Sequence, residues 1–196
     1  MRTLKTLSAL TVGMVQRPSS IFVLLRRYHV AHWVLTLQLF RWLFTSATTV
    51  VHLYVHETPM LLPPLFGMDE RLYRYYEIFL YAPYGFLIIL TISWHLAHRV
   101  HSLTGQPFTF LLAWQMVGIS YFLPWLPTLP IDNLLIQNDL ASPFILIPWH
   151  ILILGVESAL LVIGLQTLTG LNRKAAVQLA AECAFIFLAM AGALIR

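Results

Sequence analysis

The residues of this sequence that could do chemistry are charged and histidine side chains set inside long apolar runs. Arg41 stands in the stretch QLFRWLF, and Glu157 and Glu182 lie near the middle of two later apolar segments. A charge at the centre of a membrane helix costs about 2.5–3.5 kcal/mol on insertion scales, so three charges at one depth favour pairing. Because a guanidinium can engage two carboxylates at once, we expect a cluster of Arg41, Glu157 and Glu182.

A polar stripe continues from Arg41 along the same segment. Five polar residues at spacings of three and four share one helix face: Gln38, Arg41, Thr45, Thr48 and His52. Polar groups in hydrocarbon need partners, so this face is expected to point into a bundle. Two roles are open for the cluster and its stripe. One is a lock that fixes helix order, and the other is a proton relay or a polar pocket for a lipid headgroup or small ligand.

Three histidines raise the hypothesis of a metal site. His52 and His56 are four residues apart, a spacing that suits chelation of zinc or copper from one helix face. His150 of a later segment could join them, with Glu57 or Asp69 as an oxygen ligand. The alternative is that these histidines bind headgroups, water and neighbouring carboxylates at the membrane surface.

A second group of histidines raises the hypothesis of haem. His29, His32, His95 and His98 fall near one predicted membrane surface. A bis-histidine haem would need one ligand from each of two facing helices, such as His95 with His29 or His32. The sequence has no C-x-x-C-H motif for covalent attachment. We therefore predict no cofactor and keep haem or a transition metal as the alternative.

The elements that must position these residues are membrane helices. Of the 196 residues, 59% are hydrophobic and 10% are charged, against about 25% charged residues in a soluble domain. The twelve basic residues are scattered among apolar runs, which argues against nucleic acid as a partner. With a single cysteine, an intrachain disulfide is excluded.

Five segments have the roughly 20 apolar residues that a membrane helix needs: 30–55, 78–97, 108–126, 147–167 and 175–195. Stretches rich in proline, glycine and polar residues separate them. The expected fold is all-α, a polytopic bundle of five transmembrane helices over residues 29–196. Residues 1–28 are expected to form a short amphipathic segment on the membrane surface rather than a cleaved signal, since the apolar part is short and no cleavage site follows.

The distribution of basic residues orients this bundle. One side carries eight of them, namely Arg2, Lys5, Arg17, Arg26, Arg27, Arg99, Arg173 and Lys174. The other side carries three, namely Arg71, Arg74 and Arg196. Because Lys and Arg favour cytoplasmic loops, the N-terminus is predicted in the cytoplasm and the C-terminus on the opposite side.

Three stretches carry a likeness to a known family. They are RPSSIF before the first span, YYEIFLYAPYGFLIILTISWHLAHRVHSLTGQPFTFLLAWQMVGISYFLPWLP through the second and third, and LQTLTGLNRKAAVQLAAE before the last. In the pattern of proline, glycine and aromatic residues around its apolar segments, the chain resembles the Yip-domain family of five-span membrane proteins, and most of all its compact prokaryotic members. The D-L-Y-G-P-type motif of the eukaryotic members is absent. The resemblance implies a helical bundle with a non-enzymatic membrane role, and it implies no site residues.

Two functions follow as hypotheses. In the first, a non-catalytic membrane protein organises lipid or serves as an accessory or scaffold subunit of a larger assembly, with lipids and other membrane subunits as partners. The sequence has no G-x-S-x-G motif and no phosphate-binding glycine loop, which agrees with this reading. In the second, a haem- or metal-binding subunit or a small transporter uses the histidines together with the Arg41 cluster.

Overall fold

The computed structural model of the chain describes residues 17–27, 30–57, 60, 63–138, 140 and 142–194. It is 87% helical, and this described part contains no strand. Five helical segments are long and apolar enough to cross a membrane, and they are Ala31–Val55, Glu70–Thr104, Phe110–Gln137, Phe144–Thr169 and Arg173–Ala193. The predicted all-α bundle is confirmed, and five such helices are compatible with an integral membrane protein.

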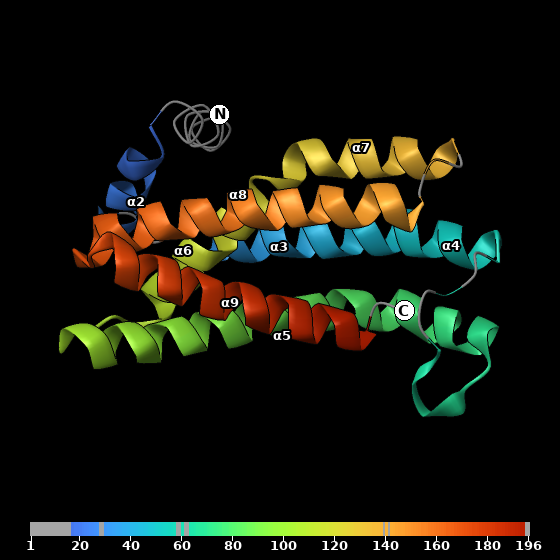
Figure 1. Cartoon of the computed structure of the whole chain (residues 1–196), viewed down its shortest axis with the longest axis horizontal. Helices are drawn as coiled ribbons and strands as arrows, with labels where there is room; N and C mark the ends of the chain where they lie inside the picture. Colours follow the sequence, from blue (N-terminus) through green and yellow to red (C-terminus); the bar gives the residue numbers. More distant parts are fainter. Residues whose placement is uncertain are drawn as a thin grey trace.

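Helix α2 (Pro18–Arg27) lies across one end of the bundle (Figure 1). Its buried residues Ile21, Phe22 and Leu25 fall on one face, as the spacing of an amphipathic helix requires. This face packs on α8 and α6. The rest of the predicted N-terminal segment 1–28, namely residues 1–16 and 28, lies outside the described residues.

The first span is one helix with a local change of winding. It runs as α3 (Ala31–Thr45), a π-helical turn η1 (Ser46–Val50) and α4 (Val51–Val55). A π-turn inserts extra residues into the helical repeat and so rotates the faces that follow it. The hydroxyl of Ser46 donates a hydrogen bond across to the carbonyl of Ile78 in the second span.

The second span is the long helix α5 (Glu70–Thr104), which follows a short 3-10 turn η2 (Leu65–Gly67). The side chain of Asp69 caps its start by accepting from the N–H groups of Arg71 and Leu72, which satisfies free donors of the first turn. Gly105, at φ 66°, ends it. Its 35 residues extend for about 52 Å, so α5 reaches beyond a hydrocarbon core of about 30 Å.

The third span is broken, and the sequence prediction is wrong about its second half. Helix α6 (Phe110–Phe122) stops at a turn through Leu123 and Pro124, and α7 (Trp125–Gln137) continues. The proline-rich stretch after residue 126 was expected to be a connection. Pro127 fits a helix because it stands in the first turn, where N–H groups have no intrahelical partner.

The last two spans form an antiparallel pair, α8 (Pro143–Thr169) and α9 (Arg173–Leu194). Gly170 joins them at φ 70°, with its N–H on the carbonyl of Gln166. In Figure 1, α7 lies along α8, whereas α6 crosses toward α5. The break between α6 and α7 therefore stands where α3, α6, α7 and α8 come together.

Candidate functional site

The guanidinium of Arg41 lies completely buried between two tryptophans. Its Cζ atom is 4.5 Å from the ring centroid of Trp42 and 4.1 Å from that of Trp125. Trp42 follows Arg41 on α3, and Trp125 is the first residue of α7. A desolvated cation over an aromatic face is worth about 2 kcal/mol. One tryptophan that follows Arg41 in the sequence and one from α7 thus help to stabilise the buried guanidinium.

The side chains around Arg41 bind the backbone where the third span breaks. Nη1 of Arg41 donates to the carbonyl of Tyr121 in the last turn of α6. One turn away, Nε2 of Gln38 donates to the carbonyl of Gly118 at 2.7 Å. Pro124 has no N–H and interrupts the helical ladder at this point. Backbone groups at membrane depth need partners inside the protein, and α3 supplies them here.

Glu157 of α8 completes this centre. Its Oε1 atom is 3.7 Å from Nη2 of Arg41, and the two side chains are 0% and 2% exposed. This distance makes an ion pair rather than a hydrogen bond. Several buried polar atoms of these side chains have no hydrogen-bond partner within the described residues: Arg41 Nε and Nη2, Trp42 Nε1, Trp125 Nε1, Tyr121 Oη and Glu157 Oε1. We call Gln38, Arg41, Tyr121, Trp125 and Glu157 the Arg41 centre.

A second polar pair lies beside the Arg41 centre, between α7 and α8. Asp132 accepts from Nε1 of Trp149 at 3.0 Å, and its other oxygen is 3.3 Å from Nε2 of His150. The His150 ring is 5.6 Å from the Trp125 ring, centroid to centroid. The side chain of His150 is 39% exposed, so aromatic and polar groups run from the protein surface to the Arg41 centre. The sequence reasoning missed Asp132, because it placed this residue in a loop instead of on α7.

The predicted cluster is wrong in its third member. Both carboxylate oxygens of Glu182 bind Arg99, from Nε and from Nη2 at 3.0 Å each. His95 and Gln178 also contact this carboxylate, at 3.0 and 3.2 Å. The side chain of Glu182 faces α5 and not Arg41. Position along a span does not give the direction of a side chain around its helix, and that direction decides which residues meet.

The outer part of the predicted stripe is satisfied within its own helix. The hydroxyls of Thr45 and Thr48 donate to the carbonyls of Arg41 and Phe44, at 2.9 and 2.8 Å. His52 stacks on His56 with ring centroids 3.9 Å apart. The π-helical turn at 46–50 lies between Thr45 and His52. It rotates the helix faces, so the stripe does not continue as one inward line.

The predicted metal site is not assembled. His52 and His56 lie on α4 and at its end, whereas His150 lies beside Asp132. Among the residues that the structure describes, no three His, Cys, Asp or Glu side chains are grouped closely enough to hold a metal ion. The two helices present these histidines to different neighbours.

The histidines of the haem hypothesis each have a neighbour in the protein. His95 binds Glu182, His98 stacks near Trp94 with ring centroids 6.2 Å apart, and His32 lies beside Trp33. His29 lies outside the described residues. The haem pairing therefore stays a prediction.

No protein-family model, no curated protein and no solved structure matches this chain. The resemblance to Yip-domain proteins therefore stays a prediction. The Arg41 centre is the candidate site because it joins three spans through ionisable and polar groups in the interior of the bundle.

Proposed function

We propose that the chain is a non-catalytic integral membrane protein of Yip-domain type that organises lipid around a rigid bundle. The observation that carries this proposal is the internal pairing of charge. Four acidic side chains within the spans each lie beside a basic one: Glu77 by Arg74, Asp132 by His150, Glu157 by Arg41 and Glu182 by Arg99. The last three of these pairs join different helices, and ion pairs between helices set helix order and register in this proposal.

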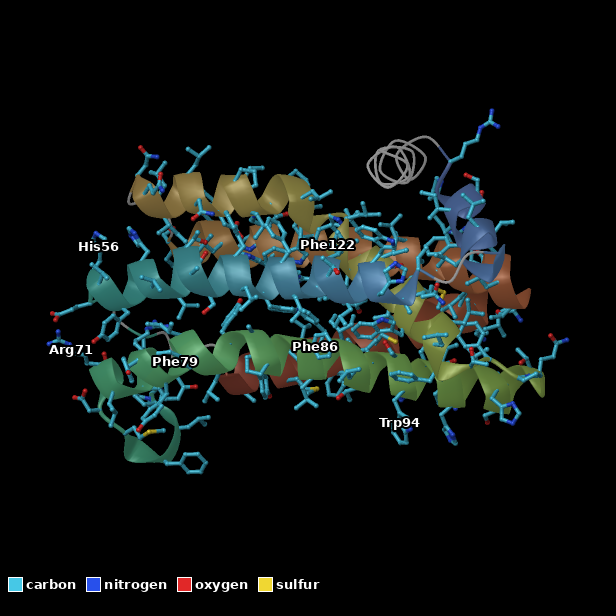
Figure 2. The ribbon with its side chains drawn as sticks, turned by 180° about the vertical axis from the view of Figure 1, so that it is seen from behind. His56, Arg71, Phe79, Phe86, Trp94 and Phe122 are labelled. Atoms are coloured by element: carbon cyan, nitrogen blue, oxygen red, sulfur yellow. The ribbon has the colours of Figure 1, made fainter. Side chains whose placement is uncertain are left out.

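The outer faces of the spans support a role toward lipid. Large apolar side chains point outward on several helices, among them Phe40, Phe79, Ile151, Phe185 and Leu188. Figure 2 shows Trp94 directed away from the bundle. Exposed apolar area of this extent suits contact with acyl chains or with apolar helices of another subunit. An accessory or scaffold role in a larger membrane assembly is therefore included in the proposal.

The proposal places the N-terminus in the cytoplasm and the C-terminus outside. Arg99, Arg173 and Lys174 come at the end of the bundle where α5 finishes and α9 starts. His56 and Arg71 lie at the opposite end (Figure 2). Basic residues prefer the cytoplasmic surface. Labelling of single cysteines placed at Lys174 and at Arg71, in a Cys183→Ser background, tests it: only the second position should react with an impermeant reagent added outside intact cells.

Lipid organisation is tested by extracting the protein with its surrounding lipid in polymer nanodiscs. Mass spectrometry then compares the headgroup composition of the discs with that of the bulk membrane. The proposal predicts a shell enriched in particular headgroups, since ordered contact selects among lipids. A shell identical to the bulk membrane, without co-purified membrane subunits, would contradict both forms of the proposal.

A second function is favoured by one observation. The line from the exposed edge of His150 through Trp125 to Glu157 is the arrangement expected of a proton or solute pathway. Proteoliposomes with an internal pH dye test it, using Glu157→Gln as the comparison. Proton flux that this variant abolishes would replace the proposed function. A Soret band or stoichiometric metal in the purified protein would favour the cofactor-binding alternative.

A further inference from the structure

A groove of about 440 Å³ runs along the outer side of α8 and α9, away from the Arg41 centre. Small residues form its floor: Gly155, Ser158 and Ala159 on α8, and Ala180, Ala181 and Ala184 on α9. Its ends are marked by larger residues, including Ile151 and Val162. The groove is lined by apolar and small side chains on the face that meets the membrane.

The groove is open space rather than a site of close helix packing. A Cβ atom built on Gly155 would meet nothing within 4 Å, whereas one built on Gly164 of the same helix would lie 2.9 Å from Met116. Gly164 therefore serves contact between helices, as small residues in membrane helices commonly do. Gly155 has no such neighbour within the described residues, and the space above it is left for something from outside the bundle.

The length of the groove matches one leaflet. From Ile151 to Val162 it follows α8 for about 16 Å at 1.5 Å per residue. Half of a typical hydrocarbon core is about 15 Å. A single extended acyl chain fits this dimension, while a transmembrane helix would need about twice the length.

Basic side chains stand at the end of the groove nearest the turn between α8 and α9. Arg173 and Lys174 are exposed and begin α9. They precede the groove residue Val177 by four and three positions, so the helical repeat places them on the same side of α9. Gln166 follows the groove residue Val162 by four positions on α8 and is also exposed. Polar and positive groups thus stand above an apolar slot.

We propose that this groove binds one acyl chain of an anionic glycerophospholipid whose phosphate lies against Arg173 and Lys174. The site deepens the proposed lipid-organising function and rests on it. The phosphate gains two cations together with the positive end of α9. The ester groups of the lipid lie at the level of Gln166. Its acyl chain fills the groove over Gly155. By the proposed orientation, this lipid belongs to the cytoplasmic leaflet.

Charge favours a lipid over a second copy of the chain. A two-fold parallel dimer through this groove would place the same surface of both copies together. Arg173 and Lys174 of the two copies would then meet at the same level of the membrane. Like charges brought together in this way oppose the contact, whereas an anionic headgroup complements them.

The test uses native mass spectrometry of the full chain in detergent, with added phosphatidylglycerol or phosphatidylcholine. The wild type should bind one phosphatidylglycerol in preference to phosphatidylcholine. Gly155→Leu should lose most of this binding, because the new side chain fills the slot. Gly192→Leu is the matched control, since Gly192 is also exposed on a membrane helix with nothing within 4 Å of its Cβ position.

A variant at the headgroup end separates the two parts of the site. Each cation near a membrane surface contributes about fivefold in affinity for anionic lipid, so Arg173→Gln with Lys174→Gln should lower the preference for phosphatidylglycerol about 25-fold. Arg71→Gln is its control, because Arg71 is exposed and lies at the opposite end of the bundle (Figure 2). If Gly155→Leu does not fold, Ala181→Leu fills the same groove from α9.

Three outcomes would overturn the site. They are equal binding by the wild type and the Gly155→Leu and Ala181→Leu variants, no headgroup preference in the wild type, and a wild-type dimer that Gly155→Leu dissociates. The nanodisc experiment separates this result from the general function. If the Gly155→Leu variant keeps the enriched lipid shell, the site fails and the function stands. If the wild type binds one lipid tightly within an unselected shell, the site stands and the function fails.

Discussion

Arg41 and Arg99 each reach a glutamate on another helix, but they do so in different surroundings. Arg99 holds Glu182 through two hydrogen bonds of 3.0 Å, and these side chains are 32% and 27% exposed. Arg41 stands 3.7 Å from Glu157, and both are buried. The better geometry thus belongs to the pair nearer solvent. Because water screens an exposed pair, burial should decide which pair the fold depends on.

The largest effect is expected at Arg41. Arg41→Met leaves the Glu157 carboxylate buried without its cation and the Tyr121 carbonyl without its donor. Removing one partner of a buried pair costs about 3–5 kcal/mol. Unfolding in mild detergent, followed by circular dichroism, measures the change in the free energy of unfolding. Stability unchanged from the wild type would sink the idea that this centre locks the bundle.

A smaller loss is expected where helices pack most closely on the same centre. A Cβ atom on Gly118 would lie 2.0 Å from Val34 Cγ1, so Gly118→Ala forces α3 and α6 apart and strains the bond from Gln38. Overpacking of this kind costs about 1–3 kcal/mol.

Gly155→Ala is the matched control for Gly118→Ala, because its Cβ enters open space. It should stabilise the helix by about 0.5–1 kcal/mol through the backbone alone. The same unfolding measurement compares the two variants. A loss of equal size at both glycines would mean that the groove over Gly155 is closed in the folded protein.

The Arg99 pair should matter less despite its geometry. Arg99→Met removes two hydrogen bonds from a partly exposed carboxylate that keeps His95 and Gln178 as neighbours. Exposed pairs contribute about 0.2–1 kcal/mol, and added salt should reduce this loss further. A loss as large as that of Arg41→Met would reverse the comparison between the two centres.

The smallest effect is expected at Arg71. Its Nη1 atom is 3.6 Å from Glu57, and both side chains are 71% exposed. Such pairs often contribute nothing measurable. Arg71→Gln should therefore leave the midpoint of thermal unfolding unchanged. A clear shift would indicate that this end of the bundle is buried in the intact protein, for instance by a partner subunit.

The contrast between the Arg41 and Arg99 pairs also shows which features of the fold the sequence could predict. Hydrophobic length alone predicted five spans, because crossing a bilayer imposes that length. The depth of Arg41 and Glu157 along their spans correctly suggested that they meet. Depth could not show that Glu182 faces α5, since neighbouring residues of a helix point in directions about 100° apart. The orientation of each helix depends on packing contacts that composition does not encode.

The α7 segment escaped sequence reasoning for a different reason. Its two prolines, with Pro124 just before it, and its polar residues are typical of a loop. Pro124 and Pro127 lie at the start of the helix, where a missing N–H is harmless. Asp132 contacts Trp149 and His150. Only the fold brings these partners together. The π-helical turn in the first span could not be predicted either, because polar residues spaced three and four apart give no indication of it.

A double-mutant cycle between Arg41 and Glu157 tests the central claim most directly. The free energy of unfolding is measured for the wild type, Arg41→Met, Glu157→Met and the double variant. If the pair locks the bundle, each single change lowers the free energy of unfolding, and the double variant is more stable than Arg41→Met. The coupling energy between the two changes is then about 1–3 kcal/mol. Additive losses, or no loss in either single variant, would show that Arg41 does not hold the bundle through Glu157.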